Sequence, residues 1–282
     1  MRRSPGLVDV TASLGALKSL VVDWLPPALV RTVGRRLGRV GNHWSGDYRS
    51  WDEALAQSSG YDAEDILARV TASALSVKNG EAACERDAVV FAEPQYDWPA
   101  LAGILLAAAS AGGQLDVLDF GGSLGSLYYL NRRFLEHLPG ARWSVVEQPG
   151  FVRTGRARFE DERLRFYESI GDCRRERQPH TVILSSVLPY LSDPYRLLGE
   201  IVAERFAFVV IDRTSFNGEG RDRLTVQKVD PAIYPASYPC WFFDETRLRA
   251  RMDEEYDLVA EFATDDRANI PSYFKGFIFK RR

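Results

Sequence analysis

The residues Leu115–Gly125 read LDVLDFGGSLG and carry the strongest fold signal in the chain. An apolar run ends at the acid Asp119, and a glycine-rich turn follows it. Beyond the turn, apolar residues recur at helical spacing until Pro139 ends the pattern. A strand, a tight turn and a helix in this order predict one unit of a doubly wound α/β sheet, in which ligands bind beyond the carboxyl ends of the strands.

Short apolar runs separated by helix-length segments continue this pattern to the end of the chain. Further strands are predicted at Trp143–Glu147, Leu164–Tyr167, Thr181–Ser185, Phe206–Ile211, Tyr256–Phe262 and Phe274–Phe279. The last two have no long helix between them and predict an antiparallel hairpin. Residues 113–282 are therefore predicted to form a mostly parallel, seven-stranded sheet with helices on both faces.

The residues before the sheet divide into two predicted segments. Residues 43–112 are expected to form a helical extension, because Ser50 is placed to cap a helix and helical patterns continue to Ala111. Residues 1–42 hold seven basic and two acidic side chains among apolar residues. Such a segment either lies on an anionic membrane surface as an amphipathic helix or packs its apolar face on the body of the protein.

The composition favours a folded protein in a reducing cytoplasm, with peripheral membrane contact as the alternative that the basic start leaves open. The 282 residues are 45% hydrophobic and 27% charged, which is ordinary globular usage. A formal net charge of −3 gives no reason to expect nucleic acid as a partner. Three scattered cysteines and three scattered histidines predict neither a disulfide framework nor a metal site. No apolar stretch is long enough to span a bilayer.

The turn after Asp119 is compatible with three nucleotide chemistries, which its residues discriminate. A phosphate-binding P-loop requires a lysine that the turn lacks. A dinucleotide fingerprint beginning at Gly121 requires glycine at 123 and glycine or alanine at 126, where serines stand, so NAD is the weaker candidate. An acid before the turn suits the positive sulfonium of S-adenosylmethionine. The predicted cofactor-binding residues are Asp119, Gly121, Gly122, Ser123 and Gly125.

A second acid, Glu147, ends the next predicted strand. A carboxylate at this position can accept hydrogen bonds from both ribose hydroxyls of an adenosine cofactor. Enzymes that bind NAD use the same device, so Glu147 indicates an adenosine cofactor without choosing between methyl transfer and hydride transfer. The alternative is that both acids are merely solvated at the strand ends.

Several motifs together carry a family resemblance. They are ERD at 85–87, VLDFGGSLGS at 117–126, VEQP at 146–149, SSVLPYL at 185–191, DR at 212–213 and SYPCW at 237–241. In these motifs the chain resembles, from about residue 44 to its end, a bacterial family of class I S-adenosylmethionine-dependent methyltransferases whose acceptor is uncharacterised. The resemblance implies this fold and cofactor, extends the cofactor site to Gln148, and suggests a sugar or glycan-linked acceptor in surface-polysaccharide biosynthesis. Ser123 departs from the broad methyltransferase pattern D-x-G-x-G-x-G, in which glycine stands at this position.

The acceptor side is predicted beyond the fourth and fifth strands. Asp212 is the first candidate base for an acceptor hydroxyl, and Arg213 is the candidate clamp that holds the acceptor. The alternative is a structural ion pair involving these two residues. Ser185, Ser186 and Tyr190 are expected to face the cofactor, with Tyr190 as a further candidate catalytic residue. The two serines are equally compatible with a helix cap.

Two further groups are candidate substrate-binding residues. Tyr238 and Trp241 lie in an aromatic and proline-rich segment, which forms either a lid whose rings stack on a sugar or a plug between the helical extension and the sheet. Arg86 either closes the site from the extension or pairs its helices. The predicted function is therefore O-methylation of a sugar or small-molecule acceptor. A non-catalytic cofactor-binding protein of a polysaccharide assembly and a nicotinamide-dependent oxidoreductase are the alternatives.

Overall fold

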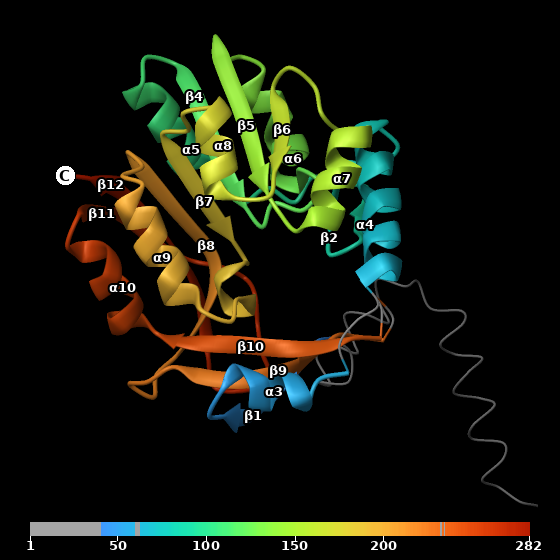
Figure 1. Ribbon diagram of the computed structural model, residues 1–282, viewed down its shortest axis with the longest axis vertical. Coiled ribbons are helices and arrows are strands. Elements are labelled where there is room, and N and C mark those ends of the chain that lie inside the picture. The colour runs from blue at the N-terminus through green and yellow to red at the C-terminus, as the bar shows by residue number, and fades with distance from the viewer. Residues whose placement is uncertain (1–40, 60–62, 232, 234) are drawn as a thin grey trace, which may run out of the picture. The chain divides into compact units, whose positions relative to one another are not determined.

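The computed structural model describes residues 41–59, 63–231, 233 and 235–282 (Figure 1). The chain divides into two units, Met1–Asn42 and His43–Arg282, and every element named below belongs to the second. The amphipathic helix and the membrane contact predicted for residues 1–42 fall outside the described residues, apart from Gly41 and Asn42. Among the described residues, no helix has the length and apolarity needed to cross a membrane.

Five parallel strands form the centre of the sheet, in the spatial order β6-β5-β4-β7-β8. Strand β12 pairs antiparallel with β8, and β11 pairs antiparallel with β12, which completes seven strands. The strands are β4 (Gln114–Phe120), β5 (Gly140–Val146), β6 (Leu164–Tyr167), β7 (Thr181–Ser185), β8 (Phe208–Asn217), β11 (Tyr256–Ala263) and β12 (Tyr273–Arg281). The predicted mostly parallel sheet of seven strands and its terminal antiparallel hairpin are confirmed.

Helices cover both faces of this sheet, because the strand side chains alternate between two apolar cores. Val182 and Leu184 of β7 point into one core, together with helices on that side, while Ile183 between them points into the other. The helices are α3 (Trp51–Ala56), α4 (Ala63–Lys78), α5 (Trp98–Ser110), α6 (Ser126–Leu135), α7 (Pro149–Arg158), α8 (Ile170–Glu176), α9 (Pro194–Ala203) and α10 (Glu245–Asp253), with the short helix η1 (Leu188–Tyr190). The sheet is therefore doubly wound.

Two segments differ from the sequence prediction. The helical extension contains three strands, β1 (His43–Tyr48), β2 (Cys84–Arg86) and β3 (Val89–Phe91), in addition to helices. The aromatic segment predicted as a lid or plug is the strand β10 (Ser237–Asp244), which pairs with β9 (Arg223–Lys228). Strand propensity depends strongly on the neighbours that a segment pairs with, and those neighbours are distant in the sequence.

Strands β1, β9 and β10 form an antiparallel extension of the main sheet. Pro239 is tolerated in the middle of β10 because β10 pairs with β8 only at Phe243 and Asp244, so the other edge of Pro239 has no β8 partner. Figure 1 shows β9 and β10 crossing below the carboxyl ends of the parallel strands. The residues that follow β4, β5, β7 and β8 thus lie at the edge that faces this extension.

Candidate functional site

The loop between β4 and α6 approaches its surroundings so closely that glycine is required. Gly121 and Gly125 have φ values of 73° and 90°, in the left-handed region that favours glycine. Ser123 adopts the same region at φ 55°. A Cβ on Gly122 would lie 2.4 Å from Cγ of Asp119. The acid therefore lies directly beneath the loop.

Asp119 is buried and held from behind the loop. The indole Nε1 of Trp143 donates a hydrogen bond to its Oδ2 at 3.0 Å, and the side chain is 1% exposed. Burial raises the pKa of Asp119 to about 7, and the nearby charge of Glu147 acts in the same direction. Asp119 was predicted as a cofactor-binding residue. In the structure it lies close beneath Gly122, where it fixes how near the loop can approach, and its role in cofactor binding stays a prediction.

Glu147 follows β5 and faces the same loop. Its Oε1 accepts a hydrogen bond from the backbone N–H of Ser123 at 3.3 Å, and its Oε2 accepts one from the backbone N–H of Gln148 at 2.7 Å. Burial raises the pKa of Glu147 above its ordinary value. Because each carboxylate oxygen has a further lone pair, Glu147 can still accept two ligand hydroxyls. The side chain of Gln148 is exposed, and its backbone takes the N-cap position of α7.

A third carboxylate, Glu85 of β2, lies at the start of α6. The hydroxyl of Ser126, the first residue of that helix, donates a short hydrogen bond to Oε1 of Glu85. Burial raises the pKa of Glu85 above its ordinary value. The β2–β3 hairpin therefore brings a negative charge to the helix N-terminus that follows the glycine-rich loop. Glu85 belongs to the ERD motif of the sequence, but its place at the start of α6 was not predicted.

The residues predicted for the acceptor side lie around the middle of β8, beside the carboxyl end of β7. Asp212 is fully buried, and its Oδ2 accepts a hydrogen bond from Ser185 Oγ at 2.8 Å. The backbone N–H of Ser186 donates to the carbonyl oxygen of Asp212 at 3.0 Å. The predicted helix cap at the two serines is not observed, because Val187 occupies the N-cap position of η1. The two serines instead link β7 to β8.

Arg213 forms an ion pair, as the structural alternative predicted. Its partner is Asp266 and not Asp212. Its Nε and Nη2 donate to Oδ2 and Oδ1 of Asp266 at 3.1 Å and 2.9 Å. Burial acts to raise the pKa of Asp266, but the hydrogen bonds and charge of Arg213 hold it below its ordinary value. The positive charge of Arg86 contributes in the same sense. Arg213 and Arg86 thus both lie near Asp266.

Tyr190 and Tyr238 pack together on one side of β10. Their rings make a T-shaped contact with 5.4 Å between centroids, and the Tyr190 hydroxyl donates to Oε1 of Gln227 at 2.9 Å. Burial raises the pKa of the Tyr190 hydroxyl well above its ordinary value, so this hydroxyl stays protonated near neutral pH. Gln227 lies on β9, a strand that the sequence did not predict.

Trp241 lies on the opposite face of β10 from Tyr238, so the two rings do not line one acceptor pocket. Side chains alternate along a strand, and these two residues are an odd number of positions apart. The indole Nε1 of Trp241 donates to the carbonyl oxygen of Leu191 at 3.0 Å. Its ring stacks on that of Trp51 with 6.5 Å between centroids. A lid on one face of β10 would therefore present only one of the two rings, and substrate binding by either ring stays a prediction.

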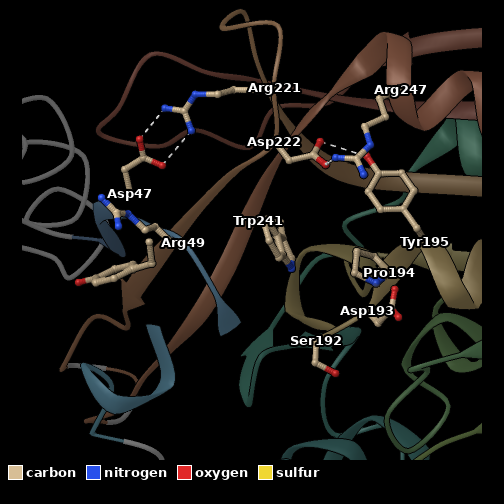
Figure 2. Close-up of a pocket in the computed structure, with 11 residues that line it drawn as sticks. Asp47, Arg49, Ser192, Asp193, Pro194, Tyr195, Arg221, Asp222, Trp241 and Arg247 are labelled. Carbon is tan, nitrogen blue, oxygen red and sulfur yellow. Dashed lines mark hydrogen bonds and ion pairs between the residues drawn. The ribbon is translucent and has the colours of Figure 1, made fainter. Parts of the chain in front are cut away.

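Trp241 instead lines a cavity of about 550 Å³, the outer cavity, whose walls come from the β1–β9–β10 extension and from the residues that begin α9 (Figure 2). The acids around this outer cavity are already paired. Nη1 of Arg221 donates to Oδ1 of Asp47 at 3.0 Å, and Arg247 lies 2.7 Å from Oδ2 of Asp222. Figure 2 shows these two ion pairs on the rim, on either side of Trp241.

Sequence reasoning did not identify Asp97, which caps the N-terminus of α5. Its Oδ1 accepts a hydrogen bond from the backbone N–H of Ala100 at 3.2 Å. Its carboxyl group also lies within hydrogen-bonding distance of Asp212. The local signal was present, since an aspartate two residues before Pro99 is typical of a helix start. Its proximity to Asp212 has no signal in the sequence.

No protein-family model and no curated protein match the chain. Solved structures of similar fold include the N-terminal domain of EvdMO1 with S-adenosylhomocysteine and D-fucose, at 16% identity and a TM-score of 0.47, covering 79% of this chain and 98% of that one. The magnesium protoporphyrin IX methyltransferase of Synechocystis PCC 6803 is 14% identical over 66% of this chain and 82% of its own, with a TM-score of 0.44. The amino pentose methyltransferase CalS10 of Micromonospora echinaspora is 14% identical over 67% and 93%, with a TM-score of 0.42. Similarity at this level leaves cofactor and reaction to the residues of the site itself.

Proposed function

We propose that this chain is an S-adenosylmethionine-dependent methyltransferase that acts on a hydroxyl group of a sugar or other small molecule. The glycine-rich loop after β4 would hold the methionine part of the donor. Glu147 would accept hydrogen bonds from its ribose hydroxyls, with the loop amide of Ser123 fixing the carboxylate. The polysaccharide role, and with it the cytoplasmic location, is proposed from the family resemblance of the motifs.

The position of Glu85 is the observation that carries the choice of cofactor. In dinucleotide-binding enzymes the pyrophosphate sits at the helix N-terminus after the first glycine-rich turn, where free N–H groups and the helix dipole favour an anion. Here the carboxylate of Glu85 is hydrogen-bonded to Ser126 at that position. A pyrophosphate would meet a buried negative charge. S-adenosylmethionine has no phosphate and carries a positive sulfonium, so it avoids this repulsion.

Calorimetric titration of the full-length protein with S-adenosylmethionine and, separately, with NADH tests the cofactor. The expected result is saturable binding of the first and no measurable binding of the second. The variant Glu85→Gln keeps an acceptor for the Ser126 hydroxyl and removes the charge, so it should improve any weak binding of NADH. Binding of NADH in preference to S-adenosylmethionine would overturn the proposal in favour of hydride transfer.

Methyl transfer itself is tested by the formation of S-adenosylhomocysteine. Small-molecule and glycan extracts from cells lacking this protein would be supplied together with the methyl donor. Formation of the product with extract and not without it supports an enzyme. Tight binding of the donor with no product in any extract would instead support the non-catalytic partner protein.

The basic segment carries a separate proposal, which is reversible attachment to an anionic membrane. Deletion of residues 1–42 should abolish co-sedimentation with phosphatidylserine-containing liposomes at low salt and leave donor binding intact. If the full-length chain ignores such liposomes at low ionic strength, attachment is wrong.

A further inference from the structure

Two carboxyl groups lie close together at the middle of β8, beside the carboxyl end of β7. Asp212 contributes the first, and its Oδ1 has no hydrogen-bond donor among the described residues although the side chain is fully buried. Asp97, at the N-terminus of α5, contributes the second and lies within hydrogen-bonding distance of Asp212. Two carboxylates in one buried site repel each other, so one of the two retains a proton.

The surroundings of Asp212 place that proton on its Oδ1. Burial raises the pKa of Asp212 to about 7, and the charge of Asp97 acts in the same direction. The hydrogen bond from Ser185 and the charge of Arg213 oppose the shift, but Arg213 is itself neutralised by Asp266. On the adjoining strand β12, the ammonium group of Lys275 is bound to Glu245 and Glu261. A proton on Oδ1 can be donated to Asp97, which satisfies the otherwise unpaired oxygen.

Exposure distinguishes the two acids. Asp212 is 0% exposed and cannot touch an acceptor without movement of its neighbours. Asp97 is only half-buried, so part of this residue remains accessible to solvent. We infer that Asp97 accepts the proton of the acceptor hydroxyl, and that the protonated carboxyl group of Asp212 orients it. This inference rests on the proposed methyl transfer. It replaces Asp212, the base predicted from the sequence, with Asp97 at the start of α5.

The step balances in atoms and charge. An electron pair of the acceptor oxygen forms the new bond to the methyl carbon, and the bond from that carbon to sulfur breaks with its electron pair remaining on sulfur. The positive sulfonium thereby becomes a neutral thioether. The hydroxyl proton moves to the carboxylate of Asp97, so the pair then holds two protons and releases one to solvent after the products leave.

Carboxyl ¹³C NMR titration of the full-length chain, labelled at aspartate, tests the pair without any acceptor. In the wild type the Asp212 signal should remain that of a protonated acid at pH 6. Asp97→Asn should lower its midpoint by about one pH unit or more, because a neighbouring negative charge is removed. Asparagine is as good an N-cap as aspartate, so α5 is kept. The matched control is Asp193→Asn, which caps α9 through Arg196 N at 3.0 Å and should leave the midpoint unchanged.

The roles within the pair are tested by turnover with an extract that the wild type methylates. Asp97→Asn should lower turnover by about 10²–10⁴-fold, as expected for loss of a positioned base. Asp212→Asn should lower turnover by a smaller factor than Asp97→Asn, because its amide can still accept from Ser185 and donate to Asp97. The reverse pattern would overturn the assignment of Asp97 as the base. A wild-type Asp212 that is ionised at pH 6, or a midpoint that Asp97→Asn leaves unchanged, would overturn the pair even if donor binding is normal. Absence of donor binding would instead overturn the proposed function and leave the titration result standing.

Discussion

The acids at the carboxyl edge of the sheet and the acids of the outer cavity have opposite surroundings. At the edge, burial raises the pKa of Glu85, Asp119, Glu147 and Asp212. In the outer cavity, the hydrogen bond from Arg221 lowers the pKa of Asp47, which is exposed. Pairing with Arg221 favours the ionised form of Asp47, whereas burial imposes a cost on the ionised form of the inner acids. Groups kept at such a cost are candidates for function.

The largest effect is expected from a change at Gly122, the glycine that lies over Asp119. Gly122→Ala should abolish measurable binding of S-adenosylmethionine and lower the free energy of unfolding by about 1–3 kcal/mol or more, because the methyl group would overlap the Asp119 carboxyl group. Calorimetry and urea unfolding measure the two effects. Gly218→Ala is the control, since that glycine has open space around its Cβ. Normal donor binding by Gly122→Ala would show that the loop is not the donor site.

Glu147 tests whether the inner acids bind a ligand directly. Glu147→Ala should weaken S-adenosylmethionine binding by about tenfold to a hundredfold, since loss of a charged hydrogen-bond acceptor costs about 1.5–3 kcal/mol. The matched control is Glu200→Ala, which removes an exposed glutamate of α9. Isothermal titration of both variants compares them. Unchanged affinity in a folded Glu147→Ala protein would remove this residue from the site.

The pH dependence of stability separates the two sets of acids. An aspartate with a raised native pKa binds more protons in the folded state, so its contribution is complete below the unfolded pKa near 4 and is lost as the pH rises towards 7. For Asp119, whose pKa is about 7, the loss between pH 5 and pH 7 amounts to about 2 kcal/mol.

Asp119→Asn should remove most of that loss, because the amide oxygen can still accept from Trp143 and carries no charge. Urea unfolding of the wild type and the variant at pH 5, 6 and 7 measures the difference. Parallel stability curves over this range would show that the pKa of Asp119 is not raised in the folded protein. The contrast between the two sets of acids would then fail.

The smallest effect is expected in the outer cavity. Asp47→Asn removes an ion pair between exposed side chains, and such pairs contribute little to stability. The midpoint of thermal unfolding should change by less than about 2 °C, and donor binding should be unaffected. Calorimetry of the variant measures both. A large loss of donor binding would connect the outer cavity to the site and weaken the comparison.

The glycine-rich loop and its two acids, from Asp119 to Glu147, were predictable because these parts are local. A strand, a turn and a helix succeed one another within Leu115–Leu135, and the periodicity of each is visible in the residues themselves. Parallel strands then bring Glu147 to the same edge by topology alone. The strand β10 was mistaken for a loop because its prolines and aromatic residues carry no strand pattern until β9 pairs with it.

The sequence by itself determined the doubly wound sheet, the acids at the ends of β4 and β5, and the acid within β8, since hydrophobic alternation and turn chemistry are local properties. Only the tertiary structure decided what those acids contact. It brought Glu85 to the start of α6, Asp97 against Asp212, and Asp266 to Arg213. It also placed Trp241 and Tyr238 on opposite faces of β10. Such contacts join segments far apart in the chain, and their electrostatic consequences depend on burial, which arises only once the segments pack.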